Sequence, residues 1–319
     1  MLWQDKWVIF ALMKKWHLKA IVQKTISYLP YSSKVNFLFQ KYVTKGVYLT
    51  DDYFYDRLEH ASNHIKGYAD LSDNKKLNTT LELGTGWYPV VPICMYLCGA
   101  EKIYTVDLTL LTNKAQILTT IEKFIECEDQ KKIEQYIPFL SERFQSLESI
   151  LKNKEVITLN QILEKLHLNY LVQDARKLSL QNGSIDLITS NNTFEHVYPF
   201  ILKDILKEFK RIARAGGLMS HFIDMSDHFA HFDKSITIYN YLQFSEKQWQ
   251  LIDNTVQPQN RLRITDYKKI YADLVILITR EEYREGNLKE LNSIKLNESF
   301  LKIPNTEIAK SHCHFYSKM

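Results

Sequence analysis

Apolar residues change their spacing part-way along this chain. Over the first 77 residues they recur at helical intervals, as at Val8, Leu12, Trp16 and Ala20. Pro30 is expected to end the first helix. After the polar stretch Ser72 to Asn78, short β-rich runs alternate with helical segments, which is typical of an α/β domain. The pattern predicts an N-terminal helical cap over residues 1–78 and an α/β domain over residues 79–319.

Seven runs in the second part are predicted to be strands: Thr80–Leu83, Lys102–Asp107, Leu168–Val172, Ile185–Ser190, Leu218–Ile223, Leu274–Thr279 and His312–Ser317. The second and third are too far apart for one crossover helix, so we expect a helical insertion at about residues 120–160. A second insert, at about residues 225–259, is expected to lie on the substrate side. No internal repeat or Pro/Gly-rich linker interrupts the chain, which predicts one compact unit with a cap.

Composition and charge narrow the class of protein. The four cysteines form no CxxC pair, which favours a reducing compartment and argues against structural zinc. The longest early apolar run, Trp7 to Met13, is far short of the ~20 residues of a membrane span, and no small-residue cleavage site follows it. We therefore expect a cytoplasmic protein.

The net charge of +4 is unevenly distributed, because residues 1–50 hold eight Lys against the single acid Asp5. A basic arm on a mildly acidic body suits an anionic substrate, a membrane surface or a partner better than a nucleic-acid footprint. Trp3, Trp7 and Trp16 also lie in this region. We interpret it as a cap packed on the main domain, with a peripheral membrane helix as the alternative.

The most informative local pattern is Leu81-Glu82-Leu83-Gly84-Thr85-Gly86, between a predicted strand and a helix that Pro89 opens. Glycines here let the backbone approach a ligand closely. Asp107 ends the next strand 21 residues after Gly86, close to the ~20 expected for a carboxylate that binds ribose hydroxyls. The alternative is that Asp107, like Thr109 or Thr112, caps a helix.

A nicotinamide or flavin nucleotide is an alternative ligand for this glycine-rich loop. It requires a third glycine where this chain has Pro89, so the pyrophosphate cradle is compromised. A sulfonium nucleoside has no pyrophosphate and carries positive charge, which suits the acidic Glu82 just before the glycines.

On these residues the chain resembles the class I S-adenosylmethionine-dependent methyltransferases from about Thr79 onward. The resemblance implies a Rossmann-like, seven-stranded, mostly parallel sheet with helices on both faces and an antiparallel last strand. It also implies that Glu82, Gly84, Thr85 and Gly86 hold the methionine part of S-adenosyl-L-methionine and that Asp107 holds the ribose. Tyr88 stands where the family usually has a third glycine.

The later motifs follow in the same order. Asp174-Ala175 resembles the segment that contacts adenine, although Asp174 also suits a helix cap. The stretch from Ser190 to Val197 resembles the exit of the fourth strand, so Asn191 is assigned to the cofactor and Asn192 to the substrate. Gly216 and Gly217 are expected to end the helix before the fifth strand.

Catalytic candidates come from a polar cluster after the fifth strand: His221, Asp224, Asp227, His228, His231 and Asp233. We assign His228, His196 and His231 as candidate bases, because imidazole titrates near neutrality. Structural histidines are the alternative. The order His228-x-x-His231-x-Asp233 offers metal-ligand chemistry, but its spacing is irregular and we assign no metal ligand.

Further candidates concern the acceptor. Arg261 and Arg263 suit a two-point clamp on a carboxylate or phosphate, with a solvated helix start as the alternative. An aromatic wall of the acceptor site is expected from Phe229, Phe232, Tyr239 and Tyr241, with core packing as the alternative.

The sequence therefore predicts an S-adenosylmethionine-dependent methyltransferase acting on a hydroxyl or amine of a small-molecule or glycan-like acceptor. The alternatives are a protein or RNA methyltransferase that docks through the basic arm, and a methyltransferase-like scaffold without turnover. The acceptor and the oligomeric state do not follow from the sequence.

Overall fold

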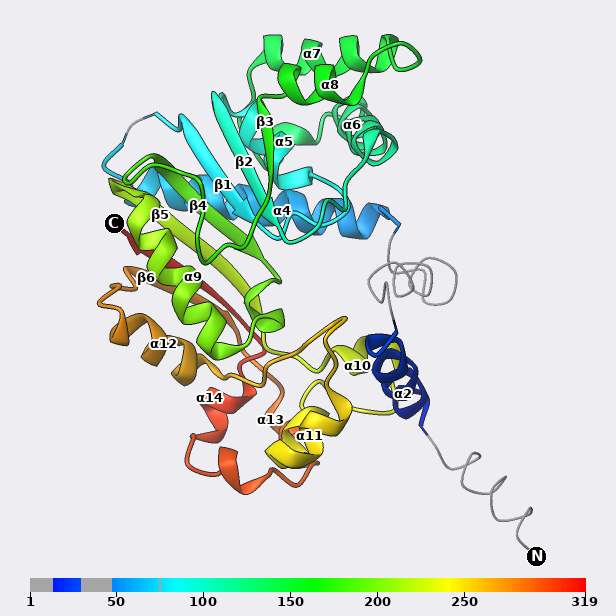
Figure 1. The fold of residues 1–319 in the computed structure, drawn as a ribbon, viewed down its shortest axis with the longest axis vertical. Coiled ribbons are helices and arrows are strands. Elements are labelled where there is room, and N and C mark those ends of the chain that lie inside the picture. Colours follow the sequence, from blue (N-terminus) through cyan, green and yellow to red (C-terminus); the bar gives the residue numbers. More distant parts are fainter. Residues whose placement is uncertain (1–13, 30–47, 75) are drawn as a thin grey trace, which may run out of the picture.

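The computed structural model describes residues 14–29, 48–74 and 76–319, and its centre is a seven-stranded sheet in the order β3-β2-β1-β4-β5-β7-β6 (Figure 1). The strands are β1 (Thr79–Leu83), β2 (Lys102–Asp107), β3 (Leu168–Val172), β4 (Ile185–Asn191), β5 (Ala213–Asp224), β6 (Arg280–Arg284) and β7 (His312–Lys318). The first five pair in parallel, and β7 is antiparallel to both β5 and β6. The expected Rossmann-like sheet with an antiparallel last strand is confirmed.

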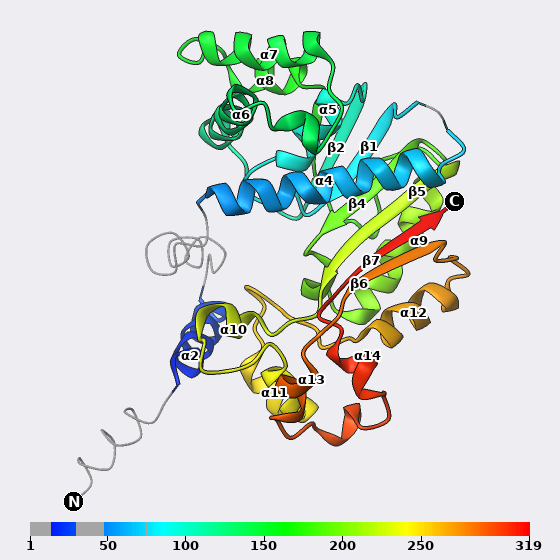
Figure 2. The same ribbon diagram turned by 180° about the vertical axis from the view of Figure 1, so that it is seen from behind.

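Helices cover both faces of the sheet. On one face α4 (Asp51–Leu71) and α5 (Val90–Leu97) pack together over the central strands (Figure 2). On the other face lie α9 (Pro199–Ile212) and α12 (Ile264–Asp273). Strand β4 is buried along its whole length, as a central parallel strand between two helical layers should be.

The segment between β2 and β3 is helical. It contains α6 (Lys114–Asp129), α7 (Ser141–Lys152) and α8 (Leu159–Lys165), and these helices join the core on the α4 and α5 side. Both α6 and α8 begin with capping boxes, Asn113 with Gln116 and Thr158 with Gln161. The sequence predicted a helical insertion at about residues 120–160, and its bounds stay a prediction.

A third cluster of buried side chains lies beyond the carboxyl ends of the strands. It joins α2 (Lys15–Ser27) to α10 (His228–Phe232), α11 (Glu246–Ile252), α13 (Leu288–Asn292) and α14 (Asn305–Ala309). Helix α2 packs on α10 and α11, whereas α4 packs on the sheet. The boundary at residue 78 stays a prediction, and Trp3, Trp7, Val8, Leu12 and Pro30 lie outside the described residues.

Two local predictions were wrong. Leu274–Thr279 is not a strand, because Leu274 is the C-cap of α12 and Val275 has a φ of +53°. Pairing with β7 starts only at Arg280, in a polar edge strand that has no apolar signature. Gly216 and Gly217 do not end a helix, since α9 stops at Ile212 and both glycines belong to β5.

Candidate functional site

The loop after β1 needs glycine for two separate reasons. Gly84 has a φ of +77°, and a Cβ on it would lie 2.5 Å from Thr193 Oγ1. Gly86 has a φ of +73°, but a Cβ on it would have nothing within 4 Å. The loop therefore passes against the exit of β4 at Gly84 and leaves space beside Gly86, where the helix α5 begins a few residues later.

Glu82 is the buried acid at the base of this loop. Its carboxylate accepts hydrogen bonds from Thr85 Oγ1 at 2.8 Å and from Asn191 Nδ2 at 3.2 Å. Burial raises the pKa of Glu82, and the bonds from Thr85 and Asn191, with the nearby charge of Arg57, oppose that shift. A cationic ligand beside Glu82 would stabilise the ionised carboxylate, which these protein groups stabilise only in part.

Asn191 belongs to a chain of buried hydrogen bonds that links β4 with α4, β5 and β7. Asn191 Oδ1 lies 2.9 Å from His64 Nε2, and His64 Nδ1 lies 2.7 Å from Ser220 Oγ. Ser220 Oγ lies 2.8 Å from His314 Nε2, and His314 Nδ1 lies 3.1 Å from the Tyr316 hydroxyl.

The direction of this chain follows from its two ends. Because Asn191 donates through Nδ2 to Glu82, its oxygen must accept from His64 Nε2–H. Burial lowers the pKa of His64 to about 3, so the ring is neutral and Nδ1 accepts from the serine hydroxyl. With neutral imidazoles, each group in the chain donates to the next one in the direction of Glu82. The chain therefore fixes the orientation of the Glu82 carboxylate.

Asp107 stands at the end of β2, next to the glycine loop. The nearby backbone amides of Gly86 and Thr85 favour the ionised form and act to lower the pKa of its carboxyl. Burial is the larger effect and, with the charge of Glu82, raises the pKa of Asp107 to about 7. The predicted methionine-side and ribose-side residues therefore do meet at the carboxyl ends of β1, β2 and β4.

The other two cofactor candidates lie at the end of β3. Asp174 is exposed, and both of its oxygens are bonded to Arg176, with a closest distance of 2.5 Å. Ala175 is buried. A ligand contact to Asp174 would have to share or displace Arg176, so its adenine role stays a prediction.

Asn192 follows the last residue of β4 in a left-handed conformation, with a φ of +48°. Its Oδ1 is buried and has no hydrogen-bond partner among the residues that the structure describes. A strained residue with an unsatisfied polar atom at a strand exit is typical of a ligand site. This supports the assignment of Asn192 to the site without deciding its ligand.

The three catalytic candidates are brought together beside Asp224, the last residue of β5. His228 Nε2 and His231 Nε2 lie 3.4 Å and 3.7 Å from Asp224 Oδ2. The His196 ring lies 4.9 Å from the His228 ring between centroids, and its Nδ1 donates to the Pro258 carbonyl at 2.6 Å. Burial lowers the pKa of His196 to about 4, which leaves this ring neutral at physiological pH.

The clamp predicted from the two arginines was wrong for Arg263. Its side chain is fully buried, and its terminal nitrogens donate to the carbonyls of Met225, Ile308 and Lys310 and to the Tyr241 hydroxyl. Arg261 donates to the carbonyls of Tyr241 and Phe244 and pairs with Glu246 at 2.8 Å. Both guanidinium groups hold the third cluster together and have few donors left for a ligand.

The predicted aromatic wall is also largely core. Tyr239 and Tyr241 are buried and donate to the carbonyls of Ala309 and Met225, and Phe229 packs in the same cluster. Phe232 alone among the four is exposed. A group of aromatic residues after a strand does not show from the sequence whether the side chains line a ligand site or pack in the core.

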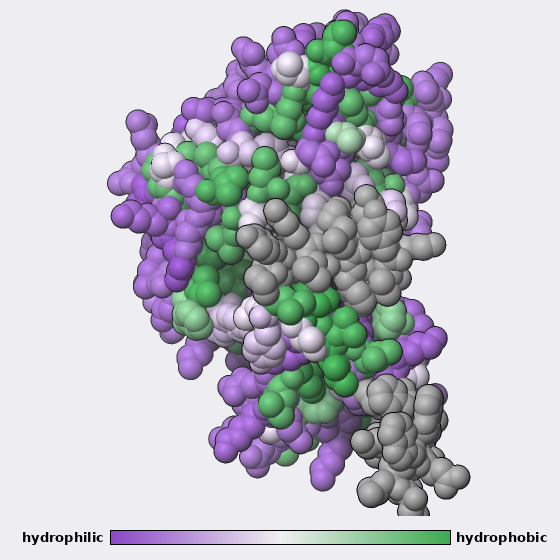
Figure 3. Space-filling view, turned by 45° about the vertical axis from the view of Figure 1, so that its right-hand side comes forward, coloured by the Kyte–Doolittle hydropathy of each residue, from purple (hydrophilic) through white to green (hydrophobic). Residues whose placement is uncertain are grey.

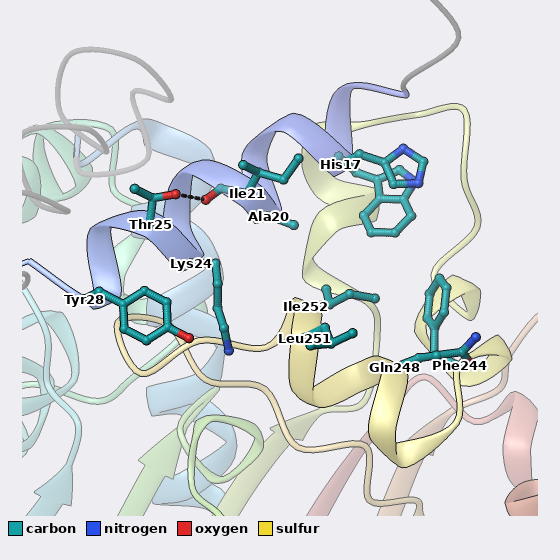
Figure 4. A pocket seen from close by; sticks show the side chains of 11 residues that line it. His17, Ala20, Ile21, Lys24, Thr25, Tyr28, Phe244, Gln248, Leu251 and Ile252 are labelled. Atoms are coloured by element: carbon teal, nitrogen blue, oxygen red, sulfur yellow. Dashed lines mark hydrogen bonds between the residues drawn. The ribbon is translucent and has the colours of Figure 1, made fainter. Parts of the chain in front are cut away.

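An open apolar groove of about 700 Å³ lies instead between α2 and α11 (Figure 4). Trp16, Ile21, Phe244, Leu251 and Ile252 line it, with Lys24 at the side. Apolar side chains gather on this lower part of the molecule in Figure 3. A small gap between the groove side and the histidines is lined by residues that include Lys19, Gln23 and His228.

Sequence reasoning missed the part of the site that comes from α4. Arg57, His60 and His64 stand at i, i+3 and i+7 on a helix whose neighbouring positions are apolar, and all three side chains are buried or nearly so. This polar stripe on a core-facing helix is the signal that was available. Glu195, buried with no partner for either oxygen in the described ranges, was likewise missed.

Comparison with known proteins gives a partial family match. A family model described as a methyltransferase domain matches residues 145–220, from α7 to the middle of β5. Part of the chain therefore matches a methyltransferase domain. The match confirms the recognition made from the sequence, the enzyme class and, with it, S-adenosyl-L-methionine as the cofactor. The matched segment includes Asp174, Asn191, Asn192 and His196 but not the glycine loop.

Solved structures similar to the methyltransferase chain are distant. The PH0226 protein from Pyrococcus horikoshii OT3 has 14% identity and a TM-score of 0.48, over 88% of this chain and 97% of that one. Geranyl diphosphate C-methyltransferase from Streptomyces coelicolor A3(2) has 12% identity and a TM-score of 0.45, over 81% and 77%. At these values the likenesses decide neither the acceptor nor the site residues. A search of curated proteins finds no match.

The structure also bears on membrane association. None of the helices in the described ranges is long and apolar enough to cross a membrane.

Proposed function

We propose that this methyltransferase transfers a methyl group from S-adenosyl-L-methionine to a hydroxyl or amine of a small-molecule or glycan-like acceptor in the cytoplasm. When bound, the cofactor supplies an electrophilic methyl carbon on a sulfonium. The acceptor oxygen or nitrogen forms the new bond to that carbon, the bond to sulfur breaks with its electron pair left on sulfur, and the acceptor proton passes to a base or to water.

The observation that carries this proposal is the acidic glycine cradle at the carboxyl ends of β1, β2 and β4. Glu82 is held by Asn191 and Thr85 so that it faces a cationic ligand, and Gly84 lets the loop lie close to it. Asp107 lies near the amides of the loop and would accept from the ribose hydroxyls. A carboxylate accepts two such hydroxyls without a proton of its own.

The acceptor is proposed to bind on the histidine side, between the cradle and the groove of α2 and α11. Asn191 pairs with Phe222, two residues before Asp224, so the histidine cluster is beside the cradle along the same sheet edge. The groove is mainly apolar, which suits an acceptor with an apolar portion. Catalysis would come mainly from holding the two reactants in line.

The membrane contact expected from the basic arm stays a proposal. In its favour, Leu18, Ile21 and Leu251 are each more than half exposed beside the lysines of α2. Flotation with anionic vesicles tests it, and a Leu18→Glu, Ile21→Glu double variant should lose binding.

Calorimetric titration tests the cofactor assignment. We expect S-adenosylmethionine and S-adenosylhomocysteine to bind and NAD not to bind. Loss of a charge-assisted hydrogen bond costs about 1.5 to 3 kcal/mol, so Asp107→Ala should weaken adenosyl binding about 10- to 100-fold. The matched control is Asp204→Ala, an exposed carboxylate paired with Lys207. NAD binding of similar strength, or an Asp107→Ala variant that binds normally, would overturn the assignment.

Transfer of labelled methyl from the cofactor then tests the acceptor class. Label in the low-mass fraction of a cell extract supports the proposal. Label in protein or RNA supports the docking alternative, and cofactor binding with no transfer to any fraction supports the scaffold.

A further inference from the structure

A cluster of one carboxylate and two imidazoles lies at the end of β5, and one of its nitrogens, His231 Nε2, also lies 3.1 Å from Ser226 Oγ. Its centre is Asp224, which is 6% exposed and lies where the last parallel strand ends. The Ser226 amide donates to Oδ1 at 2.7 Å and fixes the carboxylate. The other oxygen, Oδ2, faces two imidazole nitrogens, one from His228 and one from His231.

The distances within this triad match those between ligands of a metal ion. Oδ2 lies 3.4 Å from His228 Nε2 and 3.7 Å from His231 Nε2. A charge-assisted hydrogen bond between nitrogen and a carboxylate is normally about 2.7 to 2.9 Å. Two donor atoms that are each about 2.0 to 2.1 Å from one tetrahedral zinc ion are about 3.3 Å apart. The two distances from Asp224 Oδ2 are therefore those expected between ligands of one ion, and all three donor atoms lie within 4.8 Å of one another.

A second observation concerns Glu195, which lies near the same His228. Glu195 is 1% exposed, and neither of its carboxylate oxygens has a hydrogen-bond partner in the described parts of the chain. Glu195, His196 and His228 each offer a donor atom within 4.8 Å of the others. Leaving a buried carboxylate without a partner is costly, and a second carboxylate, Asp224, is near enough to repel it. A cation at the cluster would remove both costs.

The support around these ligands is also of the kind that metal sites use. Histidines that bind a metal commonly donate their other ring nitrogen to a carbonyl or carboxylate. Next to the proposed ligands, His196 Nδ1 makes such a bond to the Pro258 carbonyl, and a Glu195 oxygen lies within 4.8 Å of a His228 ring nitrogen. On the other oxygen of Asp224, His312 Nε2 lies 3.4 Å away.

We propose that Asp224, His228 and His231 bind one divalent transition-metal ion, with Glu195 and His196 supporting it through His228. Two imidazoles and one carboxylate suit zinc and its first-row neighbours, whereas Mg²⁺ and Ca²⁺ take oxygen ligands. Three protein ligands leave a position open. His231 is more than half exposed, so that position is reachable from solvent and from the proposed acceptor side.

This set differs from the one that the sequence suggested. Asp233, the carboxylate of the His-x-x-His-x-Asp pattern, accepts from the amides of Trp16 and Ser235 and holds α2 in place. The carboxylate of the triad is Asp224 instead, four residues before His228. The ion would lie beside the methyl-transfer site, where its open position can take an oxygen of the acceptor.

Metal binding by the full-length, untagged protein tests the proposal without any activity measurement. After treatment with EDTA and dialysis, the protein is titrated with ZnCl₂, CoCl₂ and MgCl₂ by calorimetry, and the visible absorption of bound Co²⁺ is recorded. We expect one Zn²⁺ or Co²⁺ per chain with a dissociation constant below about 1 µM, and no Mg²⁺ binding. The Co²⁺ spectrum should show the intense bands of a site with fewer than six ligands.

Variants locate the ion. Asp224→Asn and His231→Ala should each weaken Zn²⁺ binding at least about 100-fold, and Glu195→Gln about 10- to 100-fold. His167→Asn is the matched control, since it removes a histidine on the far side of the sheet at a φ of +56° that Asn adopts readily. Far-UV circular dichroism checks folding, and the exposed His231 can be removed without disturbing the core.

Two results would overturn the proposal: no Zn²⁺ or Co²⁺ binding by the folded wild-type protein, or unchanged affinity in both His231→Ala and Asp224→Asn. S-adenosylhomocysteine titration of the same samples reports on the cofactor cradle. Failure of the metal site is therefore measured separately from failure of the proposed methyl transfer.

Discussion

Asn191→Leu is the substitution that tests the buried hydrogen-bond chain most directly. Leucine has a similar volume but removes both the donor to Glu82 Oε1, at 3.2 Å, and the acceptor for His64 Nε2, at 2.9 Å. Each buried group left without a partner costs about 1 to 3 kcal/mol, with the larger values for a charged group. We therefore expect the free energy of unfolding to fall by about 3 to 5 kcal/mol, a large part of the roughly 5 to 15 kcal/mol of an ordinary domain.

Urea denaturation followed by tryptophan fluorescence measures this loss. Ser190→Ala is the matched control, because Ser190 is the preceding buried residue of β4 and makes one neutral bond, to His221 Nδ1 at 2.8 Å. It should cost about 1 kcal/mol. In a double-mutant cycle, Asn191→Leu and His64→Leu should not add. The reasoning is refuted if Asn191→Leu costs no more than Ser190→Ala or if the two leucine substitutions add.

Three further outcomes are expected. Because burial raises the pKa of Asp107 to about 7, its carboxylate is mostly protonated at pH 6 and mostly ionised at pH 8; calorimetry should show S-adenosylhomocysteine binding tighten across this range, and Asp107→Asn should remove the pH dependence. Gly84→Ala should weaken the same binding more than Gly86→Ala, since both have positive φ but only the first brings a Cβ against Thr193. Arg263→Met should lower the free energy of unfolding by about 3 to 5 kcal/mol in chemical denaturation and leave KM for the cofactor unchanged, because the guanidinium bonds protein carbonyls.

The strands of the parallel sheet were predictable because each is an apolar run bounded by a turn. β2 and β3 coincide with their predicted bounds, and β1, β4 and β7 differ by one residue at an end. β6 is an edge strand of sequence Arg-Glu-Glu-Tyr-Arg, so burial imposed no apolar pattern on it. The apolar run before it is the connection that follows α12, and Ile276 of this run enters the core.

The site was predictable only where one strand and the loop after it carry the residues. Glu82, the glycines and Asp107 follow local rules of spacing. His64 reaches the site because α4 packs across the sheet, and no spacing rule connects residue 64 with residue 191. The prediction for Arg263 was wrong for a related reason. A charged side chain is expected at the surface. The carbonyls that accept from the buried guanidinium come from segments near residues 225 and 309, which are distant in the sequence.

The position of β7 has a consequence for how the protein is made. β7 is inserted between β5 and β6, so β6 has no strand to pair with until β7, the last of the seven along the chain, has been synthesised. Until then the buried strand β5 presents an open edge, which can pair with other chains. His314 of β7 also completes the buried chain that leads to Glu82. A nascent chain stalled before residue 312 would therefore expose the unpaired edge of β5 and would lack His314 of the hydrogen-bond chain to Glu82. We expect such a chain to bind chaperones and to be inactive.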